Sequence, residues 1–182
     1  MKNKILFFLT IIVFTISCKS NKISMIISDR YDSKKNETTL TLLPFGNIII
    51  PNEWKKTSFN EVSRQHFFQD SRLNTISVAK NLKEKYPFYK ETQTDKEFVN
   101  EFVKWDSEYW KEQGLEIKVI ENKTENNYVV WNAKKQNGTK TEVNTFFVFG
   151  VKNNFVYGFS GTSKNWTDEQ TIEFLKNLYN KN

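Results

Sequence analysis

The sequence predicts an α+β fold in which a mostly antiparallel sheet of about six to seven strands is covered by two amphipathic helices. Three observations predict it. Short runs rich in β-branched and aromatic residues, separated by turn signals, recur along the chain. Two segments carry apolar residues at helical spacing. Strands precede, separate and flank those segments, which argues against a parallel doubly wound sheet. No internal repeat or second domain is visible.

The candidate strands are bounded by proline, glycine and asparagine, which favour turns. Pro51 closes the second run, and Asn137-Gly138 is the strongest short hairpin signal in the chain. Asn153-Asn154 joins the last two runs. The runs cover residues 38–43, 46–50, 64–70, 74–79, 115–120, 127–134, 141–150 and 155–161.

The first predicted helix begins at Thr94 or Asp95 and ends before Gly114, a residue typical of the position that follows a helix. Its large apolar residues recur at spacings of four and three, which predicts one stripe facing the core. Trp105 is therefore expected in the core. The stripe consists of Phe98, Phe102, Trp105 and Tyr109, broadened by Val99, Val103 and Trp110.

The second predicted helix begins at Thr167. Thr167-Asp168-Glu169-Gln170 has the pattern of a capping box, with acidic residues in the first turn. Ile172, Leu175 and Leu178 form its apolar face.

Residues 1–17 have the pattern of a signal peptide. Two lysines precede an apolar run of about 12 residues, 5–16, which is too short to span a bilayer. Ser17-Cys18 follows, and then a polar stretch. This resembles the lipobox of bacterial lipoproteins, although Thr15 stands where leucine is usual. An ordinary secretory signal and an uncleaved anchor are the alternatives.

The lipobox resemblance implies cleavage before Cys18 and palmitate-containing lipid on that cysteine. We expect residues 18–37 to be a lipidated terminus and tether, and residues 38–182 to form one globular domain. Lys19, rather than Asp, follows the cysteine, and no acidic residue occurs before Asp29. By resemblance to lipoprotein sorting signals, these features favour the periplasmic face of an outer membrane.

Charge and cysteine content exclude several classes of protein. The net charge is +6, but no block of five basic residues occurs, so a nucleic-acid partner is not expected. Cys18 is the one cysteine, so the mature domain has neither a disulfide nor a thiol nucleophile. We expect a monomer that contacts the membrane through its lipid.

No catalytic, cofactor-binding or metal-binding residue is predicted, and no cofactor is expected; Cys18 is the one predicted site residue. His66 is the only histidine and is interpreted as a surface or partly buried strand residue. Ser160 lacks the Gly-x-Ser-x-Gly context of a nucleophile. The carboxylates at helical spacing are interpreted as a solvated face. They are Glu97, Glu101, Glu108 and Glu112.

The five tryptophans are either core residues or a carbohydrate platform. Core packing is favoured, and the side of its strand on which Trp131 lies stays open. They are Trp54, Trp105, Trp110, Trp131 and Trp166.

Several sequence features resemble the PsbP-like family over about residues 38–180. An N-terminal hairpin ends in Ile-Pro-x-x-Trp at 50–54, and a long helix precedes a three-stranded meander containing 128–131 and 155–157. A C-terminal helix follows Trp-Thr-Asp-Glu at 166–169. The resemblance implies an α/β/α sandwich, a fold shared by a photosystem II extrinsic protein, a Ran-binding import factor and small bacterial lipoproteins. Its members mostly act by binding other proteins.

These observations predict a non-enzymatic envelope lipoprotein that binds an unidentified protein partner, as an accessory or assembly factor. The alternative is an immunity protein that neutralises a periplasmic antibacterial toxin. An enzyme of unknown class is the third hypothesis.

Overall fold

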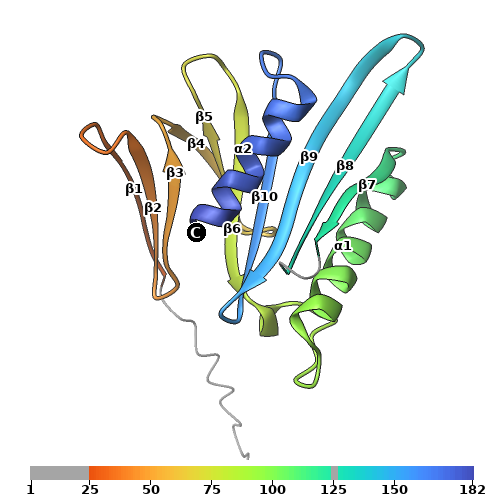
Figure 1. The fold of residues 1–182 in the computed structure, drawn as a ribbon, viewed down its shortest axis with the longest axis horizontal. Helices are drawn as coiled ribbons and strands as arrows, with labels where there is room; N and C mark the ends of the chain where they lie inside the picture. Colours follow the sequence, from red (N-terminus) through yellow and green to blue (C-terminus); the bar gives the residue numbers. More distant parts are fainter. Residues whose placement is uncertain (1–24, 124–126) are drawn as a thin grey trace, which may run out of the picture.

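The computed structural model describes residues 25–123 and 127–182, which form ten strands, two α-helices and one short 3-10 helix (Figure 1). The strands are β1 (Ile26–Asp32), β2 (Glu37–Leu43), β3 (Gly46–Pro51), β4 (Lys55–Asn60), β5 (Gln65–Gln69), β6 (Thr75–Leu82), β7 (Glu116–Lys123), β8 (Tyr128–Asn137), β9 (Lys140–Lys152) and β10 (Phe155–Thr162). The helices are η1 (Lys83–Lys85), α1 (Asp95–Glu112) and α2 (Asp168–Lys181). No helix in this part of the chain is long and apolar enough to cross a bilayer.

The strands form two antiparallel sheets. The large sheet has seven strands in the order β4-β5-β6-β10-β9-β8-β7, and the small sheet has three in the order β1-β2-β3. The predicted α+β class, with a seven-stranded antiparallel sheet and two helices, is confirmed. The separate small sheet was not predicted, because the strands at 38–43 and 46–50 carry no signal for the sheet that they join.

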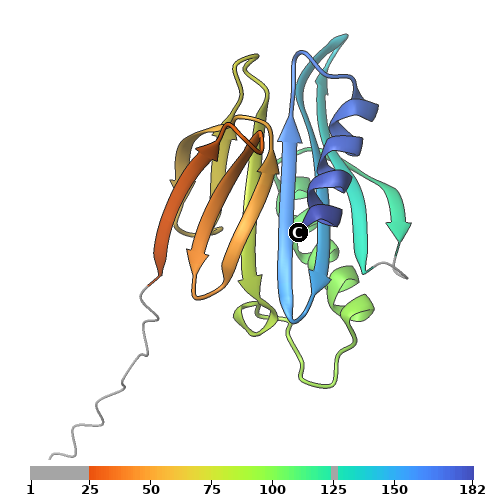
Figure 2. The ribbon, with the colours of Figure 1, turned by 60° about the vertical axis from the view of Figure 1, so that its left-hand side comes forward.

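The large sheet is buried on both faces, which makes three layers (Figures 1 and 2). Successive side chains of a strand point to opposite faces of the sheet, and β8 shows how both faces are covered. Val129 and Trp131 pack with α1 on one face, whereas Tyr128 and Val130 pack with α2 on the other. The small sheet joins α2 on that second face through Leu40, Leu42 and other apolar residues of β2 and β3. Two apolar cores therefore lie on opposite sides of one sheet.

Helix α1 begins as predicted and buries Phe98, Val99, Phe102 and Val103 of the predicted stripe, but not Trp105 or Tyr109. Thr94 and Glu97 form a capping box at its start, whereas Trp105 and Tyr109 are 45% and 58% exposed. Successive residues of an α-helix are rotated by about 100° about the helix axis. By this rotation Trp105 and Tyr109 lie at one side of the buried face, whose centre is Val99 and the residues one turn away from it. The prediction that Trp105 is a core residue is therefore wrong. Its ring packs instead beside Tyr86 and Phe88 from the preceding loop.

The predicted tether is wrong in its second half. Residues 26–32 form β1, which pairs with β2 over seven residues from Ile26↔Leu43 to Asp32↔Glu37. Its polar composition hid the strand, because β1 is an edge that water reaches. Cys18, the predicted signal peptide and the first part of the tether lie outside the described residues. β4 was also missed, since its sequence KKTSFN is mostly polar.

Candidate functional site: an open groove between two sheet edges

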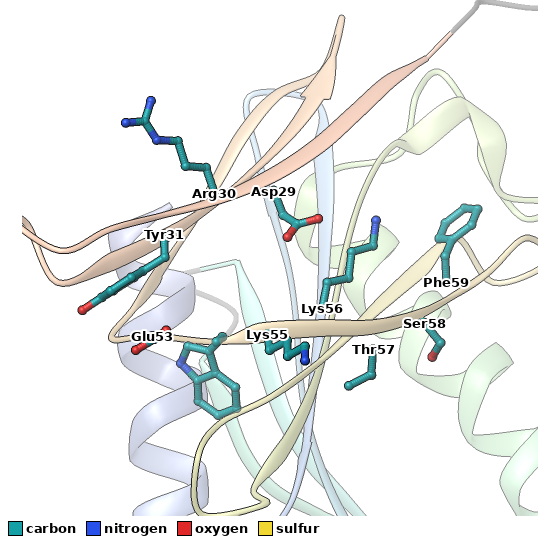
Figure 3. Close-up of a pocket in the computed structure, with 10 residues that line it drawn as sticks. Asp29, Arg30, Tyr31, Glu53, Lys55, Lys56, Thr57, Ser58 and Phe59 are labelled. Carbon is teal, nitrogen blue, oxygen red and sulfur yellow. The ribbon is translucent and has the colours of Figure 1, made fainter.

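An open groove of about 600 Å³ separates β1 of the small sheet from β4 of the large sheet. Figure 3 shows Asp29 and Lys56 extending toward each other across it, whereas Arg30 points away. The two sheets pack face to face near β2, β3, β5 and β6 but do not close at this margin. The lining residues are Asp29, Arg30, Tyr31, Glu53, Trp54, Lys55, Lys56, Thr57, Ser58 and Phe59.

The register of β1 decides which of its side chains face the groove. Asp29 pairs with Leu40 and Tyr31 with Thr38. Residues directly opposite in a sheet share a face, and both Leu40 and Thr38 are buried against the large sheet. Asp29 and Tyr31 therefore point inward, into the gap between the sheets. Asp29 is nevertheless exposed, because β4 lies too far away to cover it.

The opposite wall comes from β4, which pairs with β5. Lys56 is opposite Phe68 and Phe59 is opposite His66, so Lys56 and Phe59 turn to the same inner face. The register shifts between Lys56 and Ser58, and this β-bulge brings both side chains to the groove. The result is a wall with one cation and one aromatic ring.

His66 lies beneath this wall rather than on the surface. It is 2% exposed and its ring stacks on Phe59 at 4.5 Å between centroids. Burial, with a smaller contribution from the charge of Lys56, lowers the pKa of His66 to about 4. Its Nδ1 has no hydrogen-bond partner among the described residues. His66 is therefore neutral near pH 7 and lies beneath the groove wall. The prediction of a surface or partly buried histidine is corrected to a buried one.

The edge strands of the two sheets differ in how they are protected. Sheet edges expose unpaired N–H and C=O groups, and proteins usually blunt them with bulges, lysines or caps. β4 has two lysines and a bulge, and β7 has a bulge between Val119 and Glu121. At β3, the amide of Asn182 accepts from Ile49 N–H (2.7 Å) and donates to Ile49 O (3.0 Å). Among the edges that the structure describes, β1 alone has neither a bulge nor such a cap.

The other residues considered from the sequence do not converge on a site. Ser160 is buried and shares a 2.6 Å hydrogen bond with Ser77. Glu97 belongs to the helix cap, where hydrogen bonds from Thr94 lower its pKa. Within residues 25–123 and 127–182, no three His, Cys, Asp or Glu side chains lie close enough to hold a metal ion.

The tryptophans are mainly structural. Trp131 is fully buried and stacks on Phe147 at 4.0 Å, which resolves the side of the strand that it occupies. Trp54 is buried, and its indole N–H donates to Pro51 O at 2.8 Å. Trp166 packs against Trp54, edge to face. These contacts leave Trp105 as the exposed exception.

One partly buried acid was not anticipated from the sequence. Burial raises the pKa of Asp106 on α1 to about 6, and the indole N–H of Trp110, which donates at 3.3 Å, acts in the opposite direction. The carboxyl lies on the α1 side of the large sheet, away from the groove. A smaller hollow of about 370 Å³ also lies on that side, between α1 and β7.

Among the groove residues, the sequence pointed only to Trp54, as one of five tryptophans that could form the core or a carbohydrate platform. One signal could have found β4, since lysines in a polar run are a common feature of edge strands, and β4 begins with Lys55 and Lys56. No local signal distinguishes the inner side chains of β1, because their direction follows from pairing with β2.

No family model and no curated relative matches the sequence. Among solved structures, the chain is similar to the solution structure of cyanobacterial PsbP (CyanoP) from Synechocystis sp. PCC 6803, with 17% identity and a TM-score of 0.45. The match covers 90% of this chain and 95% of that chain. A similarity of this size concerns the course of the chain and transfers no site.

Proposed function

We propose that this chain is a non-catalytic lipoprotein of the cell envelope that binds an extended segment of a protein partner along β1. Lipid on Cys18 holds the domain at the periplasmic face of the outer membrane. The partner adds a strand to the small sheet. The observation that carries the proposal is the straight, uncapped edge of β1 beside an open groove.

The geometry of β1 suits strand addition. Every second residue of an edge strand turns its N–H and C=O away from its neighbour, here away from β2. A partner strand would gain affinity from those main-chain groups and specificity from alternate side chains that enter the groove. Tyr31 and Phe59 offer aromatic contacts there, and Asp29 and Lys56 offer opposite charges.

The partner is a different protein rather than a second copy. Asp29 points inward from the edge strand, and inward charges discourage identical edges from pairing. Two copies joined along β1 would bring two Asp29 carboxylates to the same gap. A strand with a cation or a hydrogen-bond donor opposite Asp29 avoids that repulsion.

The groove lacks the pairing that nucleophilic catalysis needs. A serine or threonine nucleophile requires a base within hydrogen-bond reach. In the groove, the hydroxyl of Thr57 donates to Phe67 O at 3.2 Å, and Ser58 points away from the inner wall (Figure 3). His66 is covered by Phe59. These contacts support binding rather than chemistry.

Site-specific photo-crosslinking in the native cell tests the groove. A photoreactive phenylalanine analogue replaces Tyr31 or Phe59, and replaces Tyr109 on the far helix as the control. We expect Tyr31 and Phe59 to give one shared protein adduct and Tyr109 to give none. Lys56→Glu should weaken that adduct, whereas Arg30→Glu, which points away, should leave it. Equal adducts from Tyr109, or none from the groove, would refute the proposal.

The anchor has its own test. Cys18→Ser should abolish incorporation of labelled fatty acid and leave unprocessed precursor, because cleavage requires the lipidated cysteine. Normal processing of the variant would contradict the anchor while leaving the groove untouched.

A further inference from the structure

A small apolar patch lies where the chain enters the domain. Ile26 is 62% exposed and Leu43 is 46% exposed, and they are direct partners across β1 and β2. Pro44 follows Leu43 and is also exposed. We call Ile26, Leu43 and Pro44 the entry patch.

The entry patch belongs to the outer face of the small sheet. Leu42, next to Leu43, is buried against the large sheet, and successive residues of a strand alternate between faces. Ile26 and Leu43 therefore point away from the core. Beyond them the outer face becomes polar and then cationic, without a carboxylate as far as Arg30. The outward residues in this stretch are Ser28 and Arg30 on β1 and Thr41 and Thr39 on β2.

The short tether limits how far this patch can lie from the membrane. Eight residue steps separate Cys18 from Ile26, and an extended chain of that length reaches at most about 28 Å. The seven-residue hairpin strand is itself about 23 Å long. In Figure 1 the start of β1 and the β2–β3 turn lie at the lower end, while the β5–β6 turn lies at the upper end. A lipid on Cys18 thus holds the lower end near the lipid headgroups.

We infer that the entry patch rests on the bilayer, with Ile26, Leu43 and Pro44 in the headgroup region of an anionic phospholipid leaflet. An apolar end followed by hydroxyl groups and a cation matches the order of environments from the acyl boundary to water. Two exposed aliphatic side chains bind a membrane weakly alone. A short tether raises their effective concentration at the surface, so weak contact is enough. This inference rests on the lipid anchor of the proposed function and adds an orientation to it.

The orientation matters for the groove. Asp29 and Tyr31 face inward from the same strand whose first residue touches the membrane. A domain that rests on the entry patch therefore holds the groove beside the membrane surface. A domain that reorients freely on its tether would not hold the groove in one position.

Depth-dependent quenching on the full lipidated protein tests the inference. Cys18 is the only cysteine, and lipid occupies its sulfur, so a new cysteine can be labelled alone. An environment-sensitive fluorophore is placed at Leu43→Cys or, as a matched control, at Leu73→Cys, a 69% exposed leucine in the β5–β6 turn. The protein is reconstituted in phosphatidylethanolamine–phosphatidylglycerol vesicles that carry headgroup-quencher lipids.

We expect quenching and a blue shift at position 43 and neither at position 73. Adding Ile26→Ser should reduce the quenching at position 43 while the protein still floats with the vesicles. Flotation without quenching at position 43, or equal quenching at both positions, would overturn the seated orientation and spare the anchor. Failure to float would refute the anchor and the seated orientation with it.

Discussion

The two edge strands of the small sheet differ in whether another part of the chain covers them. At β3, α2 ends beside the strand, and the amide of Asn182 pairs with Ile49 almost as a further strand residue would. Lys181 adds an ion pair to Glu37 at 2.7 Å. At β1, no element of the described chain covers the strand, and a groove opens on its inner side. The sheet is therefore capped on one side and uncovered on the other, where the inward charge of Asp29 restricts which strands can pair.

The difference teaches that the open edge is not a consequence of a weak core. β2 and β3 bury Leu40, Leu42, Ile48 and Ile50 completely or almost so, in the same apolar core that holds α2. The groove begins only where β1 and β4, both polar strands, replace those apolar walls. The strands β1 and β4 can then serve binding, while the apolar core of β2, β3 and α2 provides the stability.

The sealed side, with α2 and β3, and the open side, with β1, should differ most in the loss of unfolding free energy when an apolar side chain is truncated. Leu178 of α2 is fully buried, so Leu178→Ala should lower the free energy of unfolding by about 2–5 kcal/mol. Ile26→Ala at the open edge should change it by no more than about 0.5 kcal/mol, because that side chain is already exposed. Denaturant titration measures both. Comparable losses would mean that the two sides are packed alike.

His66, on the open side, should make a distinct contribution to the pH dependence of stability. The pKa of His66 is about 4 when folded and near 6.5 when unfolded, so the unfolded chain binds more protons between these values. The contribution of His66 to stability should therefore fall by roughly 2–3 kcal/mol as the pH drops from about 6.5 to 4, whereas the raised pKa of Asp106 contributes in the opposite direction below about pH 6. Replacing the histidine by His66→Phe should remove this part of the slope. Parallel curves for both proteins would show that His66 is not buried as neutral.

A steric change should break the sealed side selectively. A methyl group at Gly150 of β9 would overlap the ring of Tyr179, which holds α2 against the sheet through a 3.1 Å hydrogen bond to Val151 O. Gly150→Ala should cost about 1–3 kcal/mol in unfolding free energy. Gly158→Ala is the matched control, since its nearest neighbour would lie at an ordinary 3.6 Å. Thermal unfolding of both variants compares them, and an undisturbed Gly150 variant would mean that α2 can shift freely.

The smallest expected effect concerns the cap on β3. Asn182→Ala removes two hydrogen bonds to Ile49 and should cost about 1 kcal/mol. Hydrogen exchange at the Ile49 amide should accelerate. The exposed neighbour Asn180→Ala should leave that amide unchanged. Unaltered exchange in both variants would indicate that α2 alone, without the amide, protects this edge.

Local signals in the sequence predicted most individual elements correctly. Thr167 caps the second helix as expected, and Thr94, one of the two predicted starting residues, caps the first; in each helix a side chain three residues later bonds back to the cap. Gly138 has a positive φ in the predicted hairpin turn between β8 and β9. Such features are readable because the groups that stabilise a cap or a tight turn lie within a few residues of one another. The processing signal ending at Cys18 is local in the same sense and stays a prediction.

Directions and neighbours were not readable in the same way. The helical spacing of α1 revealed a stripe at Trp105 but not the face that the sheet would cover. The alternation in β8 could not reveal which core Trp131 would join, and His66 looked exposed because Phe59 lies in a different strand. In each case a residue remote in sequence, or a rotation of a whole element, decides the burial.

The sequence by itself determined the α+β class, the helix ends, the main hairpin and the absence of a disulfide or thiol chemistry from residues 19–182. Only the tertiary structure decided that ten strands divide into two sheets, that one edge of the small sheet is sealed by Asn182 and that the other faces a groove. The physical reason is the sequence separation between the residues that interact. Caps and turns are stabilised by neighbouring residues, whereas an open edge depends on which distant segments pack beside it and which do not.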